Sequence, residues 1–153
     1  MTQRIDYQKI APDAVKAMYG LEKYVHGCGL EAPLLELVKY RASQINGCGY
    51  CMDMHTKDAR KKGETEQRLY CLSGWRETPF YTQRERAALA WTEAVTLVAQ
   101  TQVPDDIYED VRRNFSELEI VNLTMAIVAI NGWNRLAVSS RREVGTYQPA
   151  ASV

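Results

Sequence analysis

Apolar residues recur every three or four positions along most of the chain. In residues 12–25, for example, Val15, Met18 and Val25 fall on one face of a helix. No stretch of any length shows the strict alternation of apolar and polar residues that indicates a β-strand. The pattern predicts an all-α protein of about seven helices, at residues 12–25, 31–45, 48–62, 64–72, 82–99, 104–114 and 116–138.

Local signals predict where several of these helices begin and end. Capping boxes, in which a hydroxyl residue is followed three positions later by glutamate, start at Thr82 and Ser116. The pair Asn46-Gly47 is expected to break the second helix and turn the chain back as a hairpin, with Asn46 capping the third helix. Gly63 is expected to end that third helix. Two segments are predicted to lack helix: a loop at residues 73–81 and a frayed tail at residues 145–153.

The composition indicates a single domain of ordinary globular type, with its core at residues 12–140. The chain has 153 residues, of which 46% are hydrophobic and 25% charged. Its 19 basic and 19 acidic side chains cancel, which gives no charge pattern for nucleic acid or an anionic membrane. The first ten residues contain no apolar run, and no later run approaches the length of a membrane span, so a cytoplasmic location is expected.

One stretch concentrates reactive side chains. Cys48 and Cys51 form a C-x-x-C pair, and His55 follows four residues later. On a helix these three residues stand at i, i+3 and i+7, so both sulfurs and the imidazole share one stripe. A zinc site is the less favoured interpretation, because a second pair of ligands is missing and the other candidates are scattered: His26, Cys28 and Cys71. Two buried core cysteines remain the other alternative, but a thiol redox centre is favoured.

Physical reasoning leaves open which sulfur would attack a substrate. Cys48 falls in the first turn of its helix, where exposed backbone amides lower a thiol pKa most. Cys51 lies one turn further on, but it is four residues before His55, which could take its proton. Glu36, twelve residues before Cys48, could orient His55, although a glutamate on a helix is by default a solvated surface group.

The string from Glu36 to His55 resembles the signature of the alkylhydroperoxidase D-like family, within the carboxymuconolactone decarboxylase superfamily. That signature is a glutamate, eleven residues, a cysteine, two residues, a cysteine, three residues and a histidine. Glu36, Cys48, Cys51 and His55 match all four positions. Residues 129–135, which read AINGWNR, are similar to the end of the family's last core helix, so the resemblance spans about residues 30–140.

The resemblance implies a peroxidase that reduces organic hydroperoxides without a metal or organic cofactor. Cys51 would attack the peroxide and become a sulfenic acid, and Cys48 would then condense with it to a disulfide. Glu36 and His55 would form the proton relay. The electron donor would be a dithiol such as a lipoyl group or a thioredoxin-like protein, and the family implies a homotrimer or homohexamer. Better-known members carry a histidine where this chain has Tyr50, which can hydrogen-bond but is a poor base at neutral pH.

Other residues are assigned structural roles, and two other functions stay open. Cys28 and Cys71 are expected to be inert, and His26 to lie in a loop. Core or interface packing is favoured for the aromatics Trp75, Phe80, Tyr81 and Trp91, and helix packing or oligomer contacts for Asn131, Asn134 and Arg135. A redox adaptor or sensor would use the same disulfide without fast turnover. A decarboxylase or lactone-processing enzyme is disfavoured, because such chemistry needs no adjacent dithiol.

Overall fold

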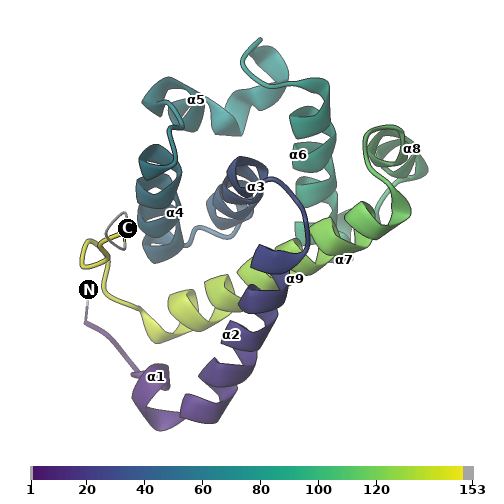
Figure 1. Ribbon diagram of the computed structural model, residues 1–153. Helices are drawn as coiled ribbons and strands as arrows, with labels where there is room; N and C mark the ends of the chain where they lie inside the picture. The colour runs from purple at the N-terminus through teal and green to yellow at the C-terminus, as the bar shows by residue number, and fades with distance from the viewer. Residues whose placement is uncertain (1, 150–153) are drawn as a thin grey trace.

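The computed structural model describes residues 2–149, and within that range the chain is all-helical and contains no strand (Figure 1). The predicted fold class is therefore confirmed. The helices are α1 (Tyr7–Ile10), α2 (Pro12–Gly27), α3 (Ala32–Ile45), α4 (Gly49–Lys61), α5 (Glu66–Tyr70), the 3₁₀ helix η1 (Leu72–Glu77), α6 (Gln83–Thr96), α7 (Val98–Thr101), α8 (Asp105–Asn114) and α9 (Glu117–Ser140).

Helix α3 is the central element of the fold. It packs against α4, α6 and α9, and in Figure 1 it is seen almost end-on between α4 and α6, with α9 crossing below. Residues 34 to 39 of α3 are all buried, and Leu37 and Val38 have no exposed surface. A helix that is covered on nearly every side carries its charged side chains into the interior. This position decides where Glu36 lies.

Both predicted capping boxes are present. The hydroxyl of Thr82 accepts a hydrogen bond from the Glu85 amide at 3.2 Å, and the Glu85 carboxylate accepts one from the Thr82 amide at 2.7 Å. Ser116 and Glu119 form the same pair of bonds at the start of α9. Each box satisfies amides that have no partner within the helix, so these two boundaries were predictable from residues three apart.

The prediction of a loop at residues 73–81 is wrong for the first part of that segment, because the 3₁₀ helix η1 runs from Leu72 to Glu77. This segment is ordered by tertiary contacts, because the Trp75 ring is buried and its Nε1–H donates to the Glu93 carboxylate on α6 at 2.9 Å. The predicted helix 82–99 is divided at Leu97 into α6 and α7. The short helix α1 was not predicted.

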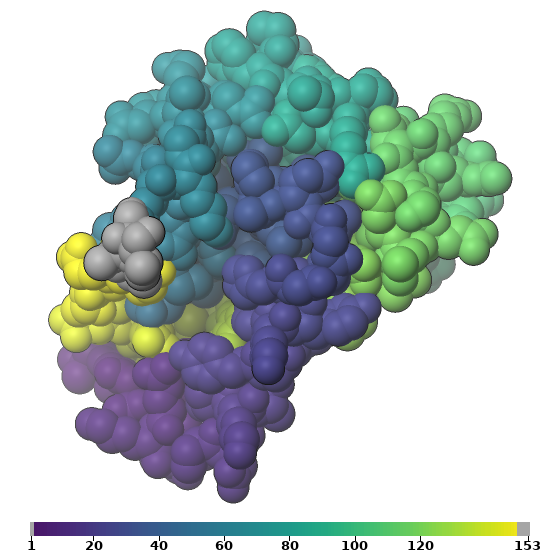
Figure 2. Space-filling model, in the orientation of Figure 1, coloured from purple at the N-terminus to yellow at the C-terminus, as the bar shows by residue number. Residues whose placement is uncertain are grey.

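The N-terminal segment and the segment after α9 meet beside α4. The Arg4 amide donates to the Ser140 carbonyl at 2.8 Å, and Lys57 on α4 donates to the Tyr147 carbonyl at 3.0 Å. Figure 2 shows these segments and α4 side by side at one edge of the molecule. Tyr147 also donates from its hydroxyl to Asp58, so the predicted frayed tail is anchored at this residue; residues 150–153 of that prediction lie outside the described residues.

No single helix in the described range is long and apolar enough to cross a membrane. Helices α8 and α9 reach that length and composition only when they are taken together, and the chain bends by 116° between them.

Candidate active site

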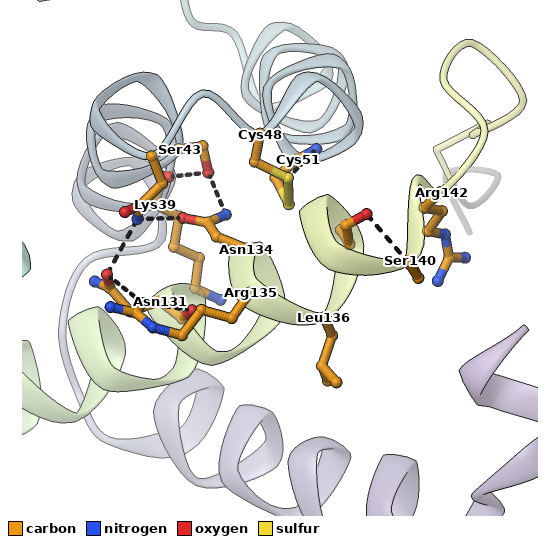
Figure 3. The surroundings of a disulfide bond; sticks show 12 residues. Lys39, Ser43, Cys48, Cys51, Asn131, Asn134, Arg135, Leu136, Ser140 and Arg142 are labelled. Atoms are coloured by element: carbon orange, nitrogen blue, oxygen red, sulfur yellow. Dashed lines mark hydrogen bonds between the residues drawn. A yellow bond between two sulfur atoms is a disulfide. The ribbon is translucent and has the colours of Figure 1, made fainter. Parts of the chain in front are cut away.

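The two cysteines lie at the N-terminus of α4 and form a disulfide with a Cα–Cα distance of 5.4 Å, within the usual range (Figure 3). Cys48 is the N-cap residue, and its sulfur accepts a hydrogen bond from the Cys51 amide at 3.3 Å. Cys51 is the third residue of the helix. The predicted C-x-x-C pair at a helix start, after a hairpin turn, is therefore confirmed.

The turn before the disulfide is tied to α9 by side-chain amides. Asn46 donates to the side-chain oxygens of Asn131 at 3.0 Å and Asn134 at 2.8 Å. Asn134 in turn donates to the Ser43 hydroxyl at 3.1 Å (Figure 3). Asn46 was expected to cap α4, which is wrong, because its side chain is engaged with α9 and Cys48 occupies the capping position. The two asparagines on α9 thus hold the backbone that presents the dithiol.

Glu36 and His55 are in direct contact. The Glu36 Oε2 atom lies 2.9 Å from His55 Nδ1, and the two side chains are buried, with 4% and 5% of the residue exposed. The second carboxylate oxygen of Glu36 accepts a hydrogen bond from Lys62 Nζ at 2.6 Å. The default assignment of Glu36 as a surface acid is therefore wrong, because the packing of α3 against α4 closes the gap of nineteen residues between it and His55.

The carboxylate of Glu36 is strongly held in its ionised form. Burial alone would raise its pKa, but the hydrogen bond and charge of His55, together with those of Lys62, outweigh burial and lower the pKa from 4.5 to about 2. An ionised carboxylate can only accept a hydrogen bond, so His55 carries a proton on Nδ1, the nitrogen that faces Glu36. In its neutral form His55 therefore keeps a free lone pair on Nε2, one turn after Cys51.

A cavity of about 400 Å³ opens beside these residues, a volume suited to an organic molecule. Cys51, His55 and Glu36 all line it. Cys48 does not; it packs in a buried cluster with Ala42, Ile130 and Ala137. Much of the remaining wall is aromatic, formed by Tyr7, Tyr19, Tyr50 and Trp133. Of the two cysteines, only Cys51 lines the cavity.

Tyr50 contacts both the disulfide cluster and the cavity. Its ring packs against the buried cluster that contains the disulfide, and it also lines the cavity. The guanidinium carbon of Arg142 lies 4.1 Å above the ring centre. Burial raises the pKa of Tyr50, while the charge of Arg142 opposes the rise. The phenol therefore stays protonated at neutral pH and can donate a hydrogen bond.

A second buried ion pair faces the same cavity, and sequence reasoning did not identify it. Lys39, only 2% exposed, donates to the Glu22 carboxylate at 2.6 Å, and Trp133 donates to the same carboxylate at 3.0 Å. His26, expected in a loop, instead lies on α2 with its Nε2 3.6 Å from Glu22. Burial and the charge of Lys39 lower the pKa of His26. One signal was available, because Lys39 is three residues after Glu36 and so shares its side of α3.

Several residues considered from the sequence lie away from the site. Cys28 and Cys71 are free thiols and do not line the cavity. The rings of Trp75, Tyr81 and Trp91 belong to the hydrophobic core, and Phe80 is partly exposed. Within residues 2–149, no group of three or more His, Cys, Asp or Glu side chains is placed to hold a metal ion.

Comparison with known proteins identifies the family. The model of the carboxymuconolactone decarboxylase family matches residues 12–94. An uncharacterized Bacillus subtilis protein, YdfG, is 47% identical over 139 residues, which are 91% of this chain and 95% of that protein. The crystal structure of an Agrobacterium tumefaciens protein of unknown function, proposed there to be an AhpD antioxidant defence protein, has a TM-score of 0.92 at 49% identity and covers 95% of this chain and 100% of its own.

More distant structures share the fold alone. The debrominase Bmp8 has a TM-score of 0.81 at 20% identity, and the match covers 91% of this chain and 75% of that protein. The chain belongs to the carboxymuconolactone decarboxylase family, as an AhpD-like member with a C-x-x-C pair.

Proposed function

We propose that this protein reduces organic hydroperoxides through the Cys48/Cys51 dithiol. The observation that carries the proposal is the placement of Cys51 on a cavity wall together with the buried Glu36–His55 pair. A cavity of organic size, a sulfur at its wall and a base one turn away are the parts that a thiol peroxidase needs. Membership of an AhpD-like family supports the same chemistry.

Cys51 is the attacking cysteine in this proposal. In the reduced protein, His55 Nε2 takes the thiol proton, and the Cys51 thiolate attacks the terminal oxygen of the hydroperoxide. The sulfur–oxygen bond forms as the oxygen–oxygen bond breaks, and the departing alkoxide receives the proton held by His55. The products are the alcohol and a Cys51 sulfenic acid. Glu36 stabilises the protonated imidazole during the step, as a carboxylate does beside a catalytic histidine.

Cys48 resolves the sulfenic acid. Its sulfur attacks the Cys51 sulfur, water leaves, and the disulfide found in the structure is formed. An external dithiol, such as a lipoyl group or a thioredoxin-like protein, then reduces that disulfide by exchange and becomes a disulfide itself. Cys48 suits the resolving role because it lies behind Cys51 in the buried cluster, away from the cavity.

Tyr50 is assigned a hydrogen-bonding role instead of that of a base. Its phenol lines the cavity next to Cys51, and burial raises its pKa, so it remains a donor at neutral pH. A donor at this position can stabilise the oxygen that becomes negative as the peroxide bond breaks. We also propose that the protein assembles as a trimer or hexamer. Exposed apolar side chains on α9 support this assembly: Leu118, Val121, Val128 and Val138.

Limiting cumene hydroperoxide added to the fully reduced protein tests the proposal by mass spectrometry. One Cys48–Cys51 disulfide is expected for each peroxide consumed. Cys51→Ser should abolish rapid peroxide consumption, whereas Cys48→Ser should consume one equivalent and stop at a sulfenic acid that dimedone traps. Cys71→Ser, which changes a thiol remote from the cavity, is the matched control and should behave as the wild type. Unchanged turnover in Cys51→Ser would end the proposal.

The same samples distinguish the other two functions. A redox adaptor or sensor would show fast disulfide exchange with a dithiol donor, slow peroxide turnover, and a change of oligomer mass between the reduced and oxidised forms. A decarboxylase or lactone-processing enzyme would retain activity on lactone acids when both cysteines are replaced.

A further inference from the structure

Arg142 forms part of the cavity wall, and no carboxylate in residues 2–149 forms an ion pair with it. The residue follows α9, and its side chain is half-buried. One guanidinium nitrogen donates to the Tyr7 hydroxyl at 2.8 Å, and the group lies over the Tyr50 ring. Among the described residues it takes part in no ion pair. A planar guanidinium has five N–H donors, so most of its hydrogen-bonding capacity is unused by these contacts.

The acidic groups that line the cavity already have partners. Glu22 is paired with Lys39, Glu36 with His55 and Lys62, and the Asp58 carboxylate accepts from the Tyr147 hydroxyl at 2.8 Å. The lining contains four lysine or arginine side chains against three carboxylates. Of the four, Lys39 and Lys62 are the ones paired with Glu22 and Glu36, and Lys23, which like Arg142 has no carboxylate partner among the described residues, is exposed on α2. The positive charge that remains inside the cavity is therefore centred on Arg142.

The nearest acids outside the cavity do not satisfy Arg142. Asp6 and Glu143 line a second hollow that shares Arg142 and Tyr7 with the first. The Asp6 carboxylate is engaged by Lys9, through both its backbone amide and its ammonium group at 3.3 Å. Neither acid forms an ion pair with Arg142. The guanidinium therefore keeps donors available to a ligand in the cavity.

The wall of the cavity also favours a particular shape of ligand. The rings of Tyr19 and Trp133 are in tilted contact, with centroids 5.3 Å apart, and Trp133 and Tyr50 both pack against the cluster that holds the disulfide. Aromatic walls favour flat or bulky apolar groups, with which rings can stack. A volume of about 400 Å³ is far larger than hydrogen peroxide needs.

We propose that the preferred substrates are hydroperoxides that combine an aromatic or similarly bulky apolar body with a carboxylate, and that Arg142 binds the carboxylate. This inference rests on the proposed peroxidase function and adds the substrate class. The apolar body lies against Tyr19, Tyr50 and Trp133, and the hydroperoxide group reaches Cys51. Arginine suits this role because its paired N–H groups match the two oxygens of a carboxylate.

Three matched hydroperoxides test the preference: cumene hydroperoxide, its derivative with a carboxylate para to the reacting side chain, and the methyl ester of that derivative. In the wild type, kcat/KM for the carboxylate should exceed that for the ester about tenfold or more, the range expected for a charge-assisted bidentate contact. The ratio should fall towards one in Arg142→Gln. Arg141→Gln, which removes the same charge from the adjacent exposed residue, should keep the wild-type ratio.

Binding of the alcohol products to the oxidised protein separates this inference from the proposed function. Calorimetry requires no turnover, so tighter binding of the carboxylate alcohol than of its ester, lost in Arg142→Gln, supports the site even if no peroxidase activity is found. Turnover of cumene hydroperoxide without any preference for the carboxylate, in rate or in binding, would overturn the inference and leave the peroxidase intact. The wild-type comparison alone decides the result if Arg142→Gln does not fold.

Discussion

Replacing Glu36 by glutamine gives a sharp test of the proton relay, because the neighbours of Glu36 dictate how the new amide must turn. Lys62 Nζ lies 2.6 Å from one carboxylate oxygen and can only donate hydrogen bonds. The single oxygen of the glutamine therefore faces Lys62, and its NH₂ group faces His55 Nδ1. An NH₂ group can only donate, so His55 is forced to carry its proton on Nε2. In that tautomer it cannot accept the thiol proton of Cys51.

The expected loss is large, and a second substitution should recover part of it. General acid–base catalysis contributes roughly 10²–10⁴-fold, so Glu36→Gln should lower kcat/KM by that order. Adding Lys62→Met removes the donor that fixes the amide. The bond it breaks is worth about 1.5–3 kcal/mol, and the freed amide can turn its oxygen to His55. We expect about tenfold or more recovery, whereas Lys62→Met alone should lower the rate of the wild type.

Stopped-flow measurement follows peroxide consumption by the reduced protein at pH 7 with a saturating dithiol. It gives the rates of the wild type, the two single variants and the double variant. Circular dichroism shows whether each variant is folded. Glu109→Gln, which removes the charge of a half-exposed acid paired with Arg112 on α8, is the control for the lost charge. The essential result is that Lys62→Met changes the rate in opposite directions. It should lower the rate in the wild-type background and raise it in the Glu36→Gln background. A double variant as slow as Glu36→Gln or slower would refute the tautomer argument.

Three further predictions concern stability. The carboxyl carbon of Glu36, followed by NMR, should titrate near pH 2 instead of 4.5, and a midpoint at 4.5 would contradict this. Because the pKa is lower in the folded than in the unfolded state, ionised Glu36 adds about 3 kcal/mol to the free energy of unfolding above pH 4.5. This contribution is lost as the pH falls through 2. Gly20→Ala, at an open position inside α2, should raise the urea-unfolding free energy by about 1 kcal/mol, whereas Gly29→Ala, at φ +91°, should lower it by about 1 kcal/mol. Asn134→Ala should lower the unfolding free energy in the same assay by about 3 kcal/mol, because its hydrogen bonds to Asn46 and Ser43 are lost. A loss under 1 kcal/mol would show that Asn134 does not anchor the turn before the disulfide.

Helix positions and two boundaries were predictable from the sequence because they depend on neighbours a few residues apart. The capping boxes at Thr82 and Ser116 are complete within four residues each. The helix η1 was missed because it depends on the contact between Trp75 and Glu93, eighteen residues apart. Asn46 was misassigned for the same reason, since its partners are on α9 and no local pattern shows them.

The candidate site divides in the same way. Cys48, Cys51 and His55 were identified together because they share one stripe of one helix. Glu36 was included only through the family signature, and its contact with His55 depends on how α3 crosses α4. Arg142 lies at the end of another helix, ninety-one residues after Cys51, and its place over Tyr50 follows from the docking of the chain after α9. No spacing rule connects positions so far apart.

The central position of α3 explains why Glu36 was by default assigned to the surface and why the role of Lys39 was not identified. An amphipathic interpretation assigns Glu36 and Lys39 to a polar, solvated face. That face does not exist here, because the helix is buried from Leu34 to Lys39. Two opposite charges one turn apart therefore enter the same cavity and must each find a partner on another helix, since an unpaired buried charge is strongly destabilising. Glu36 pairs with α4 and Lys39 with Glu22 on α2, so the same ion pairs that line the cavity also join the helices around it.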